Sequence, residues 1–122
     1  MKRFESLAAV DAAGLDREEG MVVRRVLSDL IRASELDKGY YDPAEDGFVA
    51  LVEESDGRDQ WLDVFGWALP EADFEEVSRQ DGCFVATILS NDFGVSLVVP
   101  DRPWLPADVR AILESELQPA AG

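Results

Sequence analysis

The sequence has no histidine and only one cysteine among its 122 residues. Without histidine, serine and cysteine nucleophiles lack their usual general base, and zinc lacks its usual ligand environment. The sequence also has no phosphate-binding glycine loop and no CxxC or HExxH motif. We therefore expect a protein that is not an enzyme and has no catalytic residues, cofactor or metal site. An all-carboxylate hydrolytic site is the catalytic arrangement that these absences leave open.

The single cysteine also bears on the core. One cysteine excludes an intramolecular disulfide, and Cys83 lies in an apolar stretch, 82–86, that is typical of a buried strand. We interpret it as a small core residue, because no histidine is available to activate its thiol and Arg79 is the only basic residue close to it in the sequence.

Long apolar segments are absent as well. No run approaches the roughly 18 apolar residues that a membrane-spanning helix needs, and residues 1–5 lead into an amphipathic stretch without the apolar core of a signal peptide. We expect a cytoplasmic protein that does not enter the membrane. A length of 122 residues with 47% hydrophobic content is typical of one globular domain, so we predict a single domain over 1–122 with a frayed tail at 118–122.

Positive charge is scarce: 11 basic residues face 26 acidic ones, for a formal net charge of −15. Such a chain is repelled by nucleic acid and by anionic membranes, and it is attracted to basic partners. We therefore expect a basic protein or nucleoprotein complex as partner, with no direct nucleic-acid binding. Residues 35–81 hold most of the negative charge, which favours a dedicated contact surface over a charge spread evenly for salt tolerance.

Periodicity and turn residues predict an α+β fold of order α-ββ-α-ββ-α. Asp16 and Glu19 form a capping-box pattern before an apolar stripe, which predicts a long helix over 16–36. A weaker helical pattern over 4–13 precedes it and ends at Gly14. The remaining predicted elements are a hairpin of strands 48–53 and 60–65, a short helix 71–80, a hairpin of strands 83–89 and 95–99, and a final helix from Pro106.

These elements predict one antiparallel sheet of about four strands, with the helices mainly on one face. The two strands of the second hairpin are apolar on both sides, so we place them in the middle of the sheet. A homodimer paired through a sheet edge is compatible with this pattern.

Residues 38–47 are predicted as a connecting loop. Asp42, Asp46, Gly47 and Glu53 match four positions of a calcium-binding loop. Ala44 stands where a third oxygen ligand is needed, and the flanking segments are not two helices. We therefore interpret the segment as a turn that leads into a strand.

The predicted partner-binding surface combines the acidic residues of this region with two tyrosines. Tyr40 and Tyr41 lie in a polar loop, where we expect them to be exposed and to serve as anchors within a charged rim. Asp63 interrupts an apolar strand pattern and joins the same set. The full set is Tyr40, Tyr41, Asp42, Glu45, Asp46, Glu53, Glu54, Asp56, Asp59, Asp63, Glu71, Asp73, Glu75 and Glu76.

Three functions fit this pattern. The first is a nucleic-acid mimic that occupies a basic surface of its partner. Small acidic inhibitors of CRISPR or restriction complexes (anti-CRISPR and antirestriction proteins) are similar in size and charge, although no motif connects this chain to a named family. The second is an immunity-type protein that neutralises a basic toxin. The third is an acidic accessory domain whose charge serves solubility or salt tolerance.

Overall fold

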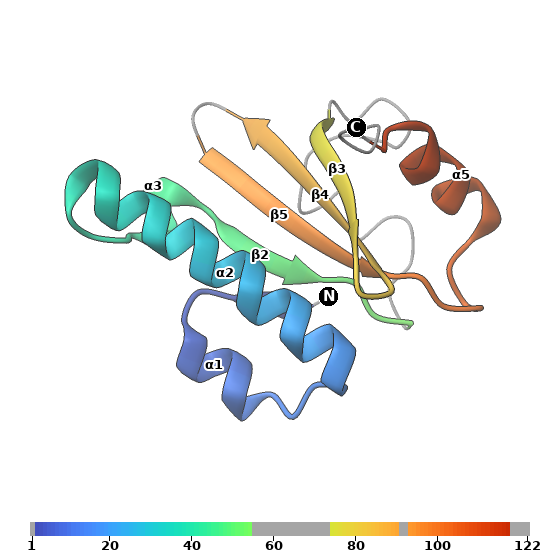
Figure 1. Ribbon diagram of the computed structural model, residues 1–122, viewed down its shortest axis with the longest axis horizontal. Coiled ribbons are helices and arrows are strands. Elements are labelled where there is room, and N and C mark those ends of the chain that lie inside the picture. Colours follow the sequence, from blue (N-terminus) through green and yellow to red (C-terminus); the bar gives the residue numbers. More distant parts are fainter. Residues whose placement is uncertain (1, 55–73, 91–92, 118–122) are drawn as a thin grey trace.

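The computed structural model describes residues 2–54, 74–90 and 93–117. The described part of the chain contains five strands and four helices, arranged around one sheet (Figure 1). In chain order they are β1 (Lys2–Phe4), α1 (Leu7–Ala12), α2 (Arg17–Lys38), α3 (Pro43–Asp46), β2 (Phe48–Leu51), β3 (Phe74–Gln80), β4 (Cys83–Ser90), β5 (Phe93–Pro100) and α5 (Ala107–Ser115).

The sheet is mixed, with strand order β1-β2-β5-β4-β3. β4 and β5 form the predicted antiparallel hairpin and occupy interior positions of the sheet, as expected from their apolar faces. β2, however, runs parallel to β5, with Phe48 opposite Val95. The prediction of a purely antiparallel four-strand sheet is therefore wrong. Local patterns identify strands, but which edges meet depends on how distant segments pack.

β1 is an element that the sequence analysis did not predict. It has three residues and pairs antiparallel with β2, with Phe4 opposite Val49. β2 therefore has a neighbour on each side, β1 and β5. The strand predicted at 60–65 as the hairpin partner of β2 lies outside the described residues, as does the tail at 118–122.

β3 replaces the short helix that was predicted over 71–80. Its residues alternate between the two faces of the sheet, and β3 pairs antiparallel with β4 across a two-residue turn. The turn residues Asp81 and Gly82 have positive φ values of 43° and 79°. Asp-Gly between strands is a strong hairpin signal, because such turns require positive φ at both central positions. Helical spacing of Phe74 and Val77 was the weaker signal, and strand pairing prevailed.

The long helix α2 confirms the main helical prediction. Val22, Val23 and Leu27 are fully buried on one side of it, and it ends at Gly39, which adopts the left-handed conformation and donates its N–H to the Glu35 carbonyl. Asp16 occupies the N-cap position but makes no side-chain cap hydrogen bond. Its carboxylate instead pairs with Arg102, which lies 86 residues away in the sequence.

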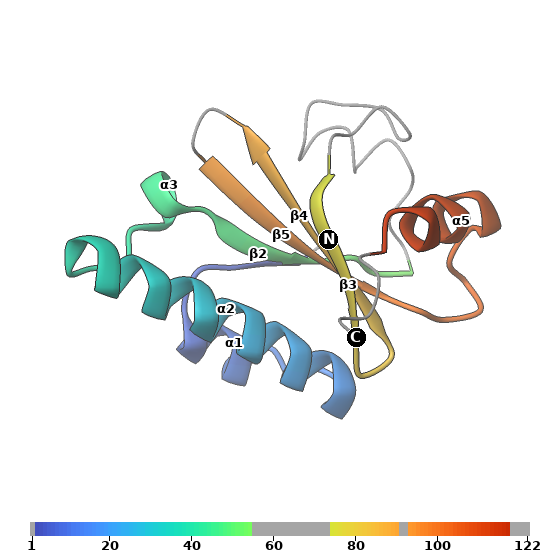
Figure 2. The same ribbon diagram turned by 45° about the horizontal axis from the view of Figure 1, so that its top comes forward.

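Helices cover both faces of the sheet, which corrects the prediction of one covered face (Figures 1 and 2). α1 and α2 pack on one face, over a core that includes Val49, Leu51 and Val98. α5 packs on the opposite face, over a core that includes Phe84 and Leu97. β2, β4 and β5 contribute side chains to both cores, which explains why their sequences are apolar on both sides.

The connection between α2 and β2 is not a simple loop, because Pro43–Asp46 forms the short helix α3. The Asp42 side chain caps it by accepting a hydrogen bond from the Ala44 N–H at 3.0 Å. Pro43 occupies the first turn, where its missing N–H costs nothing. Among the described residues, no helix is long and apolar enough to cross a membrane.

Candidate functional site

Most basic side chains of the described residues are occupied in ion pairs. Of the ten Lys and Arg residues in these ranges, eight lie within 4.0 Å of a carboxylate, and only Arg17 and Arg32 do not. The paired residues are Lys2, Arg3, Arg24, Arg25, Lys38, Arg79, Arg102 and Arg110. The positive charge is thus used locally, and the surplus carboxylates determine the character of the outer surface.

A concave group of carboxylates, which we call the acidic pocket, lies beside the N-terminus of α2. Its volume is about 280 Å³. The backbone around Leu51 and Val52 at the end of β2 contributes to its wall, as does the loop between β5 and α5. The charged and aromatic side chains that line the pocket are Lys2, Asp16, Glu19, Glu53, Glu54 and Trp104.

The electrostatics of the pocket centre on Glu19. Burial raises the pKa of this carboxyl above its ordinary value, and the neighbouring Asp16 and Glu53 carboxylates raise it further, while Arg102 acts in the opposite direction. Lys2 lies 3.9 Å from Glu53, and Arg102 lies 3.4 Å from Asp16. Among the described residues, Lys2 lines the pocket with four carboxylates and Arg102 lies beside it, and a further positive charge placed there would reduce the repulsion between the carboxylates.

The pocket joins residues that sequence reasoning found with residues that it missed. Glu53 and Glu54 belong to the predicted surface, whereas Asp16 and Glu19 were interpreted only as a helix start. The first turn of a helix favours acidic residues because of the helix dipole. That signal was visible, but only the fold brings the start of α2 to the end of β2.

A second group surrounds α3 and combines four predicted residues with Lys38, which was not predicted. We call it the α3 corner: Lys38, Tyr41, Asp42, Glu45 and Asp46. The Lys38 ammonium lies 2.6 Å from Glu45 and 3.1 Å from Asp46. The Asp46 carboxylate also accepts the Asp42 N–H at 2.8 Å. This N–H, together with Lys38, holds the pKa of Asp46 below its usual range, and the two carboxylates raise the pKa of Lys38. These carboxylates have partners within the fold.

The two adjacent tyrosines differ, although both were predicted to be exposed. Tyr40 is 53% exposed, and the Lys38 ammonium lies 4.5 Å from its ring centroid. Tyr41 is half-buried against the α1–α2 core, and its hydroxyl donates to the Gly47 carbonyl at 2.7 Å. Burial, assisted by nearby carboxylates, raises the pKa of Tyr41 to about 12. The prediction for Tyr41 is therefore corrected: its ring supports the core.

The remaining predicted residues lie elsewhere. Glu76 is exposed on β3 and lines a groove of about 440 Å³ between α2 and the strands β3, β4 and β5; Glu75 belongs to the same strand as Glu76. Asp56, Asp59, Asp63, Glu71 and Asp73 lie outside the described residues.

The described acids are therefore not one continuous surface. β2 separates the α3 corner from the acidic pocket, by on the order of 15 Å at ordinary strand rise. Glu76 lies three strand spacings from β2, roughly 14 Å. Within the described ranges, no group of three or more His, Cys, Asp or Glu residues is arranged to hold a metal ion. The chemistry that the acidic pocket offers is recognition of a cationic group beside an aromatic ring.

Comparisons with known proteins add no relative: no family model, no curated protein and no solved structure matches the chain.

Proposed function

We propose that this protein is a non-catalytic acidic binding protein that occupies a basic, nucleic-acid-binding surface of a partner protein, in the manner of a DNA mimic such as an anti-CRISPR or antirestriction inhibitor. In this proposal the acidic pocket receives an arginine or lysine of the partner. The observation that carries the proposal is the pocket itself, which among the described residues is lined by four carboxylates and by the cation Lys2, with Arg102 beside it.

The net charge supports the choice of partner. At −15 the chain steers basic surfaces toward itself, and association of this kind is fast and sensitive to salt. The internal ion pairs strengthen this argument, because they leave few free cations in the described residues to oppose a basic partner.

The pocket supports the choice of contact. A guanidinium or ammonium group would find carboxylates from both the start of α2 and the end of β2, and the half-buried Trp104 lines the same pocket, where an aromatic ring can add to the binding of a cation. The pKa of Glu19 is raised first by burial and then by the neighbouring carboxylates of Asp16 and Glu53. Binding a cation would lower this pKa and reduce the repulsion between the carboxylates. A cationic partner would therefore be bound favourably.

The test is affinity capture from host lysate on the immobilised protein. Bound material is eluted first with competing duplex DNA and then with a salt gradient, and each fraction is identified by mass spectrometry. We expect a nucleic-acid-handling protein that duplex DNA displaces. A single basic protein that salt releases and DNA does not would instead indicate an immunity-type function. No specific partner would leave the acidic accessory domain as the better description.

Two charge-matched variants locate the contact. Glu19→Gln, Glu53→Gln and Glu54→Gln together remove three negative charges from the pocket, and we expect the captured partner to bind at least ~100-fold more weakly. The control combines Asp29→Asn, Asp37→Asn and Glu116→Gln, three exposed positions outside the pocket, and we expect a change within about threefold. Equal losses in both variants would mean that net charge alone drives binding and that the pocket is not the contact.

A further inference from the structure

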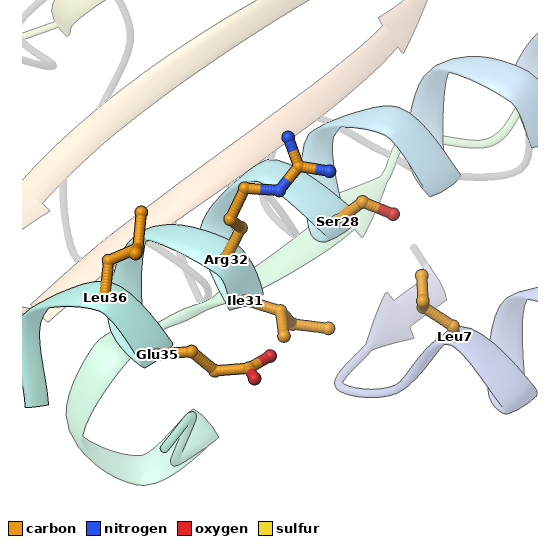
Figure 3. Close-up of a pocket in the computed structure, with 6 residues that line it drawn as sticks. All are labelled: Leu7, Ser28, Ile31, Arg32, Glu35 and Leu36. Atoms are coloured by element: carbon orange, nitrogen blue, oxygen red, sulfur yellow. The ribbon is translucent and has the colours of Figure 1, made fainter. Parts of the chain in front are cut away.

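The outer side of α2 carries a face whose inner residues, Ile31 and Leu7, pack against the α1–α2 core and whose outer residues, Arg32, Glu35 and Leu36, are exposed. Ser28, Ile31, Arg32, Glu35 and Leu36 follow helical spacing and, with Leu7 of α1, line a groove of about 460 Å³ (Figure 3). Ile31 and Glu35 project from α2 toward Leu7 (Figure 3). We call these six residues the α2 outer face.

The apolar content of this face is unusual for a protein so rich in charge. Leu36 is 82% exposed, the highest value among the large exposed hydrophobic residues of the described chain. Ile31 and Leu7 are half-buried beside it. An exposed leucine that lines the same groove as further apolar side chains is typical of an interaction surface.

The face carries one positive and one negative side chain, so two copies of it can form ion pairs with each other. Arg32 and Glu35 are exposed, and neither has an ion pair among the described residues. When two copies of a helix pack antiparallel about a two-fold axis at the midpoint between residues 33 and 34, residue 32 of one copy lies level with residue 35 of the other. Residue 31 likewise lies level with residue 36. One contact therefore forms two Arg–Glu pairs flanked by isoleucine and leucine.

A second copy fits this face better than it fits the acidic pocket or the edge strand β3. Two chains of net charge −15 repel each other, so self-association requires a surface without surplus charge. The α2 outer face has one cation and one anion, whereas the acidic pocket has an excess of carboxylates. The edge strand β3 is less available, because Val77 already forms a parallel bridge with Leu117.

We propose that the protein forms a two-fold symmetric homodimer through the α2 outer face, with Arg32 of each copy paired to Glu35 of the other and Leu36 at the contact. This contact lies on a helix, and it differs from the pairing of sheet edges that the sequence suggested. It does not depend on the proposed function, because the acidic pocket lies at the opposite end of α2 and contributes no residue to it.

Sedimentation equilibrium over ~5–200 μM protein at ~0.15 M salt tests the proposal, since salt screens the long-range repulsion between copies. We expect a reversible monomer–dimer equilibrium. Arg32→Glu and Glu35→Arg each place like charges together twice per dimer and should raise the dissociation constant by at least ~10-fold. The double variant restores both pairs with reversed sign and should return the constant to within about threefold of the original.

Matched controls separate this contact from general charge effects. Arg17→Glu makes the same charge change on α2, at a residue that also lacks an ion pair in the described ranges and lies outside the face, and it should leave dimerisation unchanged. Leu36→Gln should weaken the dimer. Because Leu36 is exposed, the variant should stay folded, which circular dichroism would verify. A monomer throughout the concentration range would overturn the proposal. So would a dimer that the double variant fails to restore.

Discussion

The α3 corner and the acidic pocket are built from the same residue types, yet their carboxylates have opposite surroundings. At the α3 corner, Asp46 accepts a backbone N–H and pairs with Lys38, so its pKa is lowered. In the acidic pocket, Glu19 is partly desolvated by burial and also lies near the Asp16 and Glu53 carboxylates, so its pKa is raised. The acids of the α3 corner are paired within the fold, whereas ionisation of Glu19 in its partly buried position is unfavourable.

This difference separates two uses of acidic residues that composition treats as one. A carboxylate whose hydrogen-bond acceptors are already satisfied gains little from a new cation, whereas a crowded carboxylate gains much. Of the described acids in 35–81, those of the α3 corner are paired within the fold, while Glu53 and Glu54 line the acidic pocket beside Glu19. Changes at the α3 corner should therefore alter stability, and changes in the pocket should mainly alter binding.

The largest effect on stability is expected at Tyr41. Tyr41→Ala removes a half-buried ring and its hydrogen bond to Gly47, and it should lower the free energy of unfolding by about 2–3 kcal/mol. Tyr40→Ala removes an exposed ring and should cost about 0.5 kcal/mol. Urea unfolding followed by circular dichroism measures both. Equal costs for the two tyrosines would contradict the structural role of Tyr41.

A smaller loss is expected at the helix cap. Asp42→Ala removes the acceptor for the Ala44 N–H and should cost about 1 kcal/mol, while Asp42→Asn keeps an acceptor and should cost less than about half of that. The same unfolding measurement applies. A cost for Asp42→Asn as large as that for Asp42→Ala would mean that charge, and not capping, is what Asp42 provides.

The pH dependence of stability should have opposite signs in the two groups. The pKa of Glu19 is raised on folding, so its contribution to stability is full below the unfolded value of about 4.3 and is lost as pH rises through the folded pKa. The pKa of Asp46 is lowered, so its contribution is present above the unfolded value of about 3.9 and is lost as pH falls through the folded pKa.

Melting temperatures of the wild type, Glu19→Gln and Asp46→Asn between pH 7 and pH 3 isolate these contributions. Acidification from pH 7 toward pH 4.5 should stabilise the wild type relative to Glu19→Gln. Further acidification should reduce the advantage of the wild type over Asp46→Asn. Parallel curves for all three proteins would contradict both assignments.

The smallest effect is expected for Glu19→Gln at neutral pH. Removing this partly desolvated negative charge should raise the free energy of unfolding of the protein without its partner by about 0.5 kcal/mol. The same change should weaken partner binding, so stability and binding would move in opposite directions. A loss of stability would mean that the Glu19 carboxylate is well paired in the fold, in conflict with its raised pKa.

Much of the secondary structure could be predicted, since its signals are local. The stripe of α2, the hairpin of β4 and β5, and the proline that opens α5 all lie within short segments. β3 was missed although Asp81 and Gly82 carried a hairpin signal, because helical spacing was preferred to turn chemistry. β1 was missed because three residues are too few to show a period, and its pairing with β2 comes from 45 residues further along the chain.

The candidate site was predictable only in part. Glu53 and Glu54 followed from the charge of their region, but their neighbours Asp16 and Glu19 belong to a distant segment. The tyrosine pair shows the same limit, since adjacent residues in one polar loop have opposite exposure. Burial and proximity depend on contacts between segments, and a single sequence read locally does not contain them.

The sequence by itself determined the acidity of this protein, its main helices, its central hairpin and the absence of histidine chemistry, because these depend on residue type and on spacing within a few turns. Only the tertiary structure decided that β2 runs parallel to β5, that helices cover both faces of the sheet, and which carboxylates are paired within the fold. The physical reason is that pairing energies between distant segments depend on distance and burial, and both exist only once the chain has folded.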